Sequence, residues 1–138
     1  MIEVYTDGAS RGNPGPSGIG VLIKVPGGRS EEYAIASGEA TNHEAEFLAV
    51  LEALKICLKK GYRSISLRTD SQIVDRALNR HYVKNERFQQ LLNEIVRLEE
   101  HFDLIFVKWV PSAQNKKADQ LARSAIHAEH KHEKGCRD

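Results

Sequence analysis

Cysteine is scarce and net charge is nearly absent in this chain of 138 residues. Its two cysteines, Cys57 in an apolar helical pattern and Cys136 near the end, suggest neither a disulfide framework nor a cysteine-based metal site, which favours a reducing compartment. Lys and Arg number 20 against 19 Asp and Glu, so the protein as a whole has no strong basic field. Any attraction for nucleic acid must therefore be local or carried by metal ions.

Long apolar runs and targeting signals are also missing. The N-terminal sequence MIEVYTDG has neither the basic nor the apolar region of a signal peptide. The run LIFVKWV is interrupted by Lys108 and is too short to span a membrane. The sequence therefore predicts a cytoplasmic protein.

The composition is that of a globular protein, with 41% apolar and 28% charged residues. The length favours a single domain, which we predict over residues 1–128. Residues 129–138 are polar and are predicted to form a disordered tail. The spacing of His127, His130 and His132 would allow metal binding, but a frayed tail explains these histidines better.

The first part of the sequence alternates strand patterns with turns rich in Gly and Pro. Apolar and β-branched residues predict strands over 2–6, 18–25 and 31–37, the first of them ending at Asp7. The segment Gly8–Ser17 is predicted as a long turn, because its glycines and prolines oppose both helix and strand. The short connections favour antiparallel pairing of these strands.

After Thr41 the apolar residues follow helical spacing. A T-x-x-E capping box at Thr41 and Glu44 predicts where the first helix begins, and Gly61 predicts where it ends. The remaining predicted elements are a strand over 64–69, helices over 71–78 and 86–100, a well-buried strand over 104–110 and a helix capped by Asn115. The order β-β-β-α-β-α-α-β-α predicts an α/β fold, a mixed sheet with helices on its faces.

Four acidic residues fall at places where functional sites often gather. Asp7 and Asp70 are predicted at the ends of the first and fourth strands, and Glu46 and Asp119 near the starts of two helices. If these carboxylates converge, they would repel one another unless a pair of divalent cations neutralised them. Oxygen-only ligands favour Mg²⁺ or Mn²⁺ over zinc, and two such ions suit a phosphoryl displacement by water.

Each acid also has a structural explanation. Asp7 suits a turn, Asp70 a helix cap and Asp119 a helix N-terminus, while Glu46 would simply be exposed to solvent. For any one acid alone this explanation is the better one, and only the four together indicate a metal site. Glu44 is assigned to the capping box and not to the site.

Four stretches of the sequence together resemble type 1 ribonuclease H, of the ribonuclease H-like superfamily. They read TDGASRGNPG, TNHEAEFLAVLEAL, TDSQ and ADQLA, and the resemblance extends from Ile2 to about Ala125. It implies the ribonuclease H-like fold, a five-stranded mixed sheet whose first three strands are antiparallel, flanked by helices. It also implies an endonuclease that hydrolyses the RNA strand of RNA–DNA hybrids and leaves 5′-phosphate and 3′-hydroxyl ends.

The resemblance also implies roles for individual residues. The implied catalytic residues and metal ligands, for two Mg²⁺ ions that Mn²⁺ could replace, are Asp7, Glu46, Asp70 and Asp119. The implied contacts to the hybrid are Ser10, Asn13, Asn42 and Gln72, with Thr41 near a phosphate of the DNA strand. Side-chain amides suit this task, because they can both donate to and accept from a 2′-hydroxyl. The implied partner is the RNA–DNA hybrid and not a membrane, and a monomer is expected.

The sequence departs from the family pattern in two places. The loop WVPSAQNKKAD is short and lacks the histidine that well-studied bacterial members carry there, which predicts slower turnover. Ser112, Gln114 or Lys116 could substitute for it in part. The cations between Asp70 and Trp109 fit a solvated helix face and not a basic protrusion, so hybrid binding is expected to be weak and salt-dependent.

These departures leave alternative functions open. One is a catalytically weak or inactive domain that binds hybrids or other nucleic acid on the same fold, although the four intact acids argue against it. Another is a different nuclease of the superfamily that acts on DNA junctions or on structured RNA. The residues implied at the 2′-hydroxyl favour the hybrid as substrate.

Overall fold

The computed structural model describes the backbone of residues 1–133 and the side chains of residues 1–126. Its strands are β1 (Ile2–Ser10), β2 (Gly15–Val25), β3 (Arg29–Ala40), β4 (Ser64–Thr69) and β5 (Leu104–Trp109). Its helices are α1 (Asn42–Lys60), α2 (Gln72–Arg80), α3 (Glu86–Glu99) and α4 (Lys116–Glu133), with a 3-10 helix, η1 (Ser112–Gln114), before α4. The order of strands and α-helices along the chain is the predicted one.

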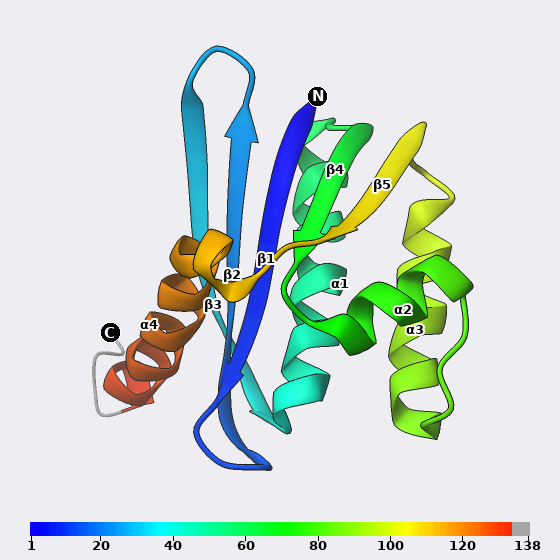
Figure 1. The fold of residues 1–138 in the computed structure, drawn as a ribbon. Helices are drawn as coiled ribbons and strands as arrows, with labels where there is room; N and C mark the ends of the chain where they lie inside the picture. The colour runs from blue at the N-terminus through cyan, green and yellow to red at the C-terminus, as the bar shows by residue number, and fades with distance from the viewer. Residues whose placement is uncertain (134–138) are drawn as a thin grey trace.

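The strands form one mixed sheet in the order β3-β2-β1-β4-β5 (Figure 1). β1 pairs antiparallel with β2, and β2 with β3, whereas β4 pairs parallel with both β1 and β5. The prediction of a mixed α/β sheet whose first three strands are antiparallel is therefore confirmed. The helices cover both faces, with α4 on one side and α1 on the other (Figure 1).

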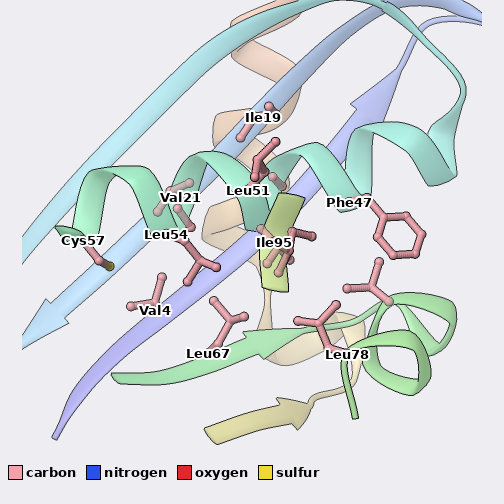
Figure 2. Close-up of a cluster of buried hydrophobic side chains, with 14 of the residues drawn as sticks. Val4, Ile19, Val21, Phe47, Leu51, Leu54, Cys57, Leu67, Leu78 and Ile95 are labelled. Carbon is pink, nitrogen blue, oxygen red and sulfur yellow. The ribbon is translucent and has the colours of Figure 1, made fainter. Parts of the chain in front are cut away.

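One face of the sheet carries the hydrophobic core, packed under α1, α2 and α3. Figure 2 shows α1 contributing Phe47, Leu51 and Leu54 to this cluster. The strands and the other helices contribute Val4, Ile19, Val21, Leu67, Leu78 and Ile95. All of these side chains are buried, and burial of apolar area at about 25 cal/mol per Å² is the main stabilising contribution to the fold.

The opposite face is covered by α4, which lies over β1, β2 and β3. The helix approaches β2 so closely that a Cβ atom at Gly20 would lie 2.0 Å from the carbonyl oxygen of Ala118. A Cβ atom at Gly18 would lie 2.1 Å from the carbonyl oxygen of Ala122. Small residues on both sides of this contact therefore set the position of α4.

The predicted start and end of α1 are confirmed. Thr41 Oγ1 accepts a hydrogen bond from the Glu44 N–H (3.2 Å), and Glu44 Oε1 accepts one from the Thr41 N–H (2.8 Å). At the other end Gly61 takes a left-handed conformation, with a φ of 82°, and closes the last turn. Arg87 also holds the Glu44 carboxylate, at 3.0 Å, so this acid stabilises the helix end as predicted.

The predicted turn after Asp7 is wrong in its extent. β1 continues to Ser10 and β2 begins at Gly15, so the turn is confined to residues 11–14. Asp7 is paired opposite Gly20 and lies inside β1, not at its end. Glycine and serine adopt an extended backbone when a neighbouring strand supplies hydrogen bonds, and this pairing outweighs the local preference for a turn.

β5 is less buried than predicted. The exposed fractions of Leu104, Phe106 and Trp109 are 43%, 55% and 40%. The strand lies at the edge of the sheet, next to β4, whereas α4 lies over β1 to β3. Only the other side of the strand faces the core, where Ile105 and Val107 are half-buried. An apolar sequence does not distinguish an edge strand from a central one.

The C-terminal helix extends further than predicted. α4 continues to Glu133, so residues 129–133 of the predicted tail are helical. Residues 134–138, with Cys136, and the side chains of the three tail histidines lie outside the described residues. The domain boundary at residue 128 stays a prediction. In the part of the chain that the structure describes, no helix combines the length and the apolar character needed to cross a membrane.

Candidate active site

The register of the parallel strands places two acids side by side. Thr6 of β1 is opposite Thr69 of β4, and this is the last pair between the two strands. Asp7 is the next residue of β1, and Asp70 directly follows the end of β4. Ser71 then turns the chain into α2, because its hydroxyl accepts a backbone hydrogen bond from the first turn of that helix (3.2 Å). Asp70 is therefore held between a strand end and a helix start, as predicted.

Glu46 reaches the same place because α1 packs against β1 through a glycine. A Cβ atom at Gly8 would lie 2.3 Å from the carbonyl carbon and oxygen of Ala45, and 2.6 Å from the backbone nitrogen of Glu46. Only glycine permits so close an approach of two backbones. The beginning of α1, with Glu46, is thereby packed against Gly8, the residue that follows Asp7 in β1.

Asp119 is brought to the site by the first turn of α4, where it is half-buried and forms an ion pair with Arg123 (3.2 Å). The predicted cap at the start of this helix is wrong for the side chain of Asn115. Its Nδ2 donates a hydrogen bond to the carbonyl oxygen of Thr6 (2.9 Å), and its Oδ1 accepts none among the described residues. The start of α4 is therefore attached to β1 directly beside Asp7.

Three of the acids meet at one point. One carboxylate oxygen from each of Asp7, Glu46 and Asp70 lies within 4.8 Å of the other two. Asp119 lines the same cleft, which has a volume of about 1000 Å³. The cleft is also lined by Ser10, Asn42 and Ser112 and by the cationic side chains of Arg11, Lys116 and Arg123. The structure thus brings all four predicted acids into one cleft.

Burial and mutual repulsion disturb the ionisation of these acids. Asp7 is only 7% exposed, and burial, followed by the neighbouring acids Asp70, Asp119 and Glu46, raises its pKa to about 8. Burial also raises the pKa of Asp70, although its interaction with Asn115 opposes this shift. A cation among these groups would favour their ionised forms.

The chemistry of the cluster fits a divalent metal ion. Its members are all carboxylates, which supply the oxygen ligands that Mg²⁺ and Mn²⁺ prefer. Zinc would favour histidine or cysteine ligands, and none joins this cluster in the described residues. Because the three oxygens already lie close together, little rearrangement would be needed to hold an ion.

Only some of the residues predicted to contact a hybrid line the cleft. Ser10 and Asn42 line it, and Asn42 Oδ1 accepts a hydrogen bond from the Ser10 N–H (3.1 Å). The Asn42 N–H in turn donates to Asn13 Oδ1 (3.0 Å), so these three residues are linked. Thr41 is the N-cap next to them. Gln72 is exposed at the start of α2 and is not part of the cleft lining.

Sequence comparisons identify relatives along most of the chain. A protein family described as reverse transcriptase-like matches residues 5–125. Ribonuclease HI of Halobacterium salinarum is 40% identical over 129 residues, which are 91% of this chain and 64% of that protein. EbsB of Enterococcus faecalis is also 40% identical, over 91% of this chain and 94% of its own length. Some relatives are longer, and this chain spans 36% of the bifunctional protein Rv2228c of Mycobacterium tuberculosis.

Solved structures agree with these relatives. RNase H1 from Halobacterium salinarum has a TM-score of 0.87 and 35% identity, over 92% of this chain and 98% of that one. LC11-RNase H1, isolated from compost and crystallised with an RNA/DNA hybrid, has a TM-score of 0.86 and 32% identity, over 94% and 99% of the two chains. This chain belongs to the type 1 ribonuclease H family. The five-stranded mixed sheet of this chain is therefore the fold that the resemblance to the family implied.

Two further side chains of this ribonuclease H contact the acids, and neither contact was predicted from the sequence. His43 Nδ1 lies 3.0 Å from Glu46 Oε1, and Arg123 pairs with Asp119. Each lies three or four residues from its acid on a helix, a spacing that places side chains on one face and could have revealed both pairs.

Proposed function

We propose that this ribonuclease H is an endonuclease that hydrolyses the RNA strand of RNA–DNA hybrids and leaves 5′-phosphate and 3′-hydroxyl ends. The observation that carries the proposal is the convergence of Asp7, Glu46 and Asp70 within 4.8 Å in a chain of this family. A domain that only bound nucleic acid would gain nothing from carboxylates crowded where phosphates must approach. The relative LC11-RNase H1, crystallised with an RNA/DNA hybrid, supports this choice of substrate.

The four acids would hold two Mg²⁺ ions, which Mn²⁺ could replace. Asp7, Glu46 and Asp70 are close enough to share an ion, and Asp119 lines the same cleft. Ions bound there would activate a water for attack on the phosphodiester and stabilise the leaving oxygen. The contribution of the chain is to fix its carboxylates on two strands and two helix starts, so that the site needs little reorganisation.

The side-chain amides of Asn13, Asn42 and Gln72 would present donors to the substrate. Backbone N–H groups, which can only donate, bind the Oδ1 atoms of Asn13 and Asn42 and so fix both amide orientations. Gln72 Oε1 likewise accepts from Arg76 (3.4 Å). The amide nitrogens are therefore the groups available to donate to 2′-hydroxyl oxygens of RNA and to acceptors in the minor groove.

Basic side chains of the cleft would receive the phosphates. Arg11, Lys116 and Arg123 line the cleft beside the acids. Because they are few, hybrid binding should be weak and should fall steeply with salt. Of the residues proposed to substitute for the missing loop histidine, Ser112 and Lys116 line the cleft, whereas Gln114 does not. The first two are therefore the candidates for moving a proton or assisting product release.

The test is cleavage of a hybrid with end-labelled RNA at low salt, first with Mg²⁺ and then with Mn²⁺. We expect cuts in the RNA strand, and a loss of about 1000-fold or more in Asp7→Asn, which removes one charge from the cluster. Asp103→Asn, which neutralises an exposed acid outside the cleft lining, should cleave like the wild type.

Two outcomes would contradict this function. Hybrid binding without cleavage by either metal would leave a domain that only binds nucleic acid. Equal cleavage of duplex RNA or duplex DNA would indicate a different nuclease of the superfamily.

We also propose that the protein acts as a cytoplasmic monomer. The scarcity of cysteine supports a reducing compartment, since the chain has only two, and Cys57 is buried in the core. All four acids come from one copy of the chain, so the cleft needs no second subunit. Sedimentation at micromolar concentration would measure the oligomeric state.

A further inference from the structure

Asn115, between η1 and α4, combines burial with an unusual set of hydrogen bonds. It is 2% exposed. Its backbone N–H donates to the carbonyl oxygen of Ser112 (2.9 Å), and its carbonyl oxygen accepts from the N–H of Asp119 (3.1 Å). Its Nδ2 donates to the carbonyl oxygen of Thr6 (2.9 Å). One buried residue is therefore bonded to the loop, to the last helix and to the central strand.

The partners of Asn115 are the immediate surroundings of the acids. Thr6 directly precedes Asp7 on β1. Asp119 is itself one of the acids, and its backbone is held by Asn115. Asn115 is thus bonded to the residue before Asp7 and to the backbone of Asp119.

A role in helix capping alone does not explain this side chain. A capping asparagine uses its Oδ1 to accept a backbone N–H from the first turn of its helix. The Oδ1 of Asn115 accepts no hydrogen bond from any described residue and is closed off from solvent. Buried acceptors are nearly always paired, so the side chain has turned toward β1 at a cost that a simple cap would not incur.

We propose that Asn115 is a positioning residue, which ties the start of α4 to β1 so that Asp7 and Asp119 are held at a spacing that binds divalent metal. The inference rests on the proposed function and extends it to a residue outside the acid set. Residues that orient metal ligands typically change metal affinity by about 10- to 100-fold when they are replaced. The same size of effect is expected here.

The experiment measures Mn²⁺ binding to the full chain by isothermal titration calorimetry, without substrate. Asn115→Ala should bind Mn²⁺ about 10- to 100-fold more weakly than the wild type, while circular dichroism shows it folded. The matched control is Asn85→Ala, since Asn85 Oδ1 accepts from the Phe88 N–H (3.0 Å) at the start of α3, away from the cleft. This control also loses a helix-start asparagine but should keep the wild-type affinity.

Each outcome decides a different point. If Asn115→Ala binds Mn²⁺ within about twofold of the wild type, or no more weakly than Asn85→Ala, the positioning role is wrong while the proposed function stands. If the wild type itself does not bind Mn²⁺, the proposed function fails and this inference fails with it. If Asn115→Ala does not fold, Asn115→Ser takes its place with the same expectation. Serine keeps a hydrogen-bond donor but is too short to reach the carbonyl oxygen of Thr6.

Discussion

The two faces of the sheet hold their helices in different ways. Under α1, large side chains such as Phe47, Leu54 and Ile95 pack together and exclude water. Under α4, glycines of β2 meet the backbone of the helix almost directly, a kind of contact that α1 makes at Gly8 of β1. Buried apolar area supplies stability, whereas direct backbone contact leaves a helix little freedom of position. Each face delivers one helix-borne acid, and the close glycine contacts place these acids while the large side chains stabilise the fold.

The largest expected effect on stability is on the core face, in Leu54→Ala. Removing this fully buried side chain leaves a cavity and should cost about 2–5 kcal/mol of unfolding free energy. Because Leu54 lies two helical turns beyond Glu46, hybrid cleavage by the folded variant at low temperature should stay within about twofold of the wild type. Denaturant unfolding and cleavage assays would measure both effects. A large loss of cleavage in the folded variant would show that the two sets of residues are not separate.

The next effect is expected on the α4 face, in Gly20→Ala. The new Cβ atom would start 2.0 Å from the carbonyl oxygen of Ala118, so α4 must move and carry Asp119 with it. Overpacking of this kind costs about 1–3 kcal/mol of stability, and a displacement of about 1 Å can cost about 100-fold in rate. Steady-state cleavage at a temperature where the variant is folded would measure the rate. Wild-type turnover would mean that α4 can shift without disturbing the acids.

A smaller effect concerns the pH dependence of stability without metal. The pKa of Asp7 is raised to about 8 in the folded protein, so between about pH 4 and pH 8 the folded chain binds more protons than the unfolded chain. Its free energy of unfolding should therefore fall as the pH rises through this window. Urea unfolding at several pH values in EDTA would measure it.

Two variants sharpen this pH prediction. Asp7→Asn should flatten the dependence, because it removes the group whose pKa is raised. Leu54→Ala should lower stability equally at every pH, because it acts on the core face. If Asp7→Asn kept the wild-type slope, the group responsible for the pH dependence would not be Asp7.

The order of elements could be predicted because it depends on local signals. The capping box at Thr41 and Glu44 and the change from strand to helical spacing are readable along the chain. The extension of β1 past Asp7 could not be predicted, because glycine-rich sequence favours a turn until β2 supplies hydrogen bonds. The exposure of β5 depends on which strands α4 covers, and a strand's own sequence does not show this.

For the candidate site too, local motifs could be predicted from the sequence and long-range contacts could not. The four acids were predicted from motifs, and the structure places all of them at one cleft. The side-chain bond of Asn115 was missed because its partner, Thr6, lies 109 residues earlier in the chain. Long-range contacts of this kind have no local pattern, so only the folded chain reveals them.

Gly8 also bears on how related sequences should be interpreted. No other amino acid fits between β1 and α1 at this position, although glycine has no side chain with which to bind metal or substrate. A relative with another residue at this position could keep all four acids, but they would no longer converge in one cleft. Counting acids is therefore not enough to assign nuclease activity to a homologue, and the glycine after the first aspartate should be counted with them.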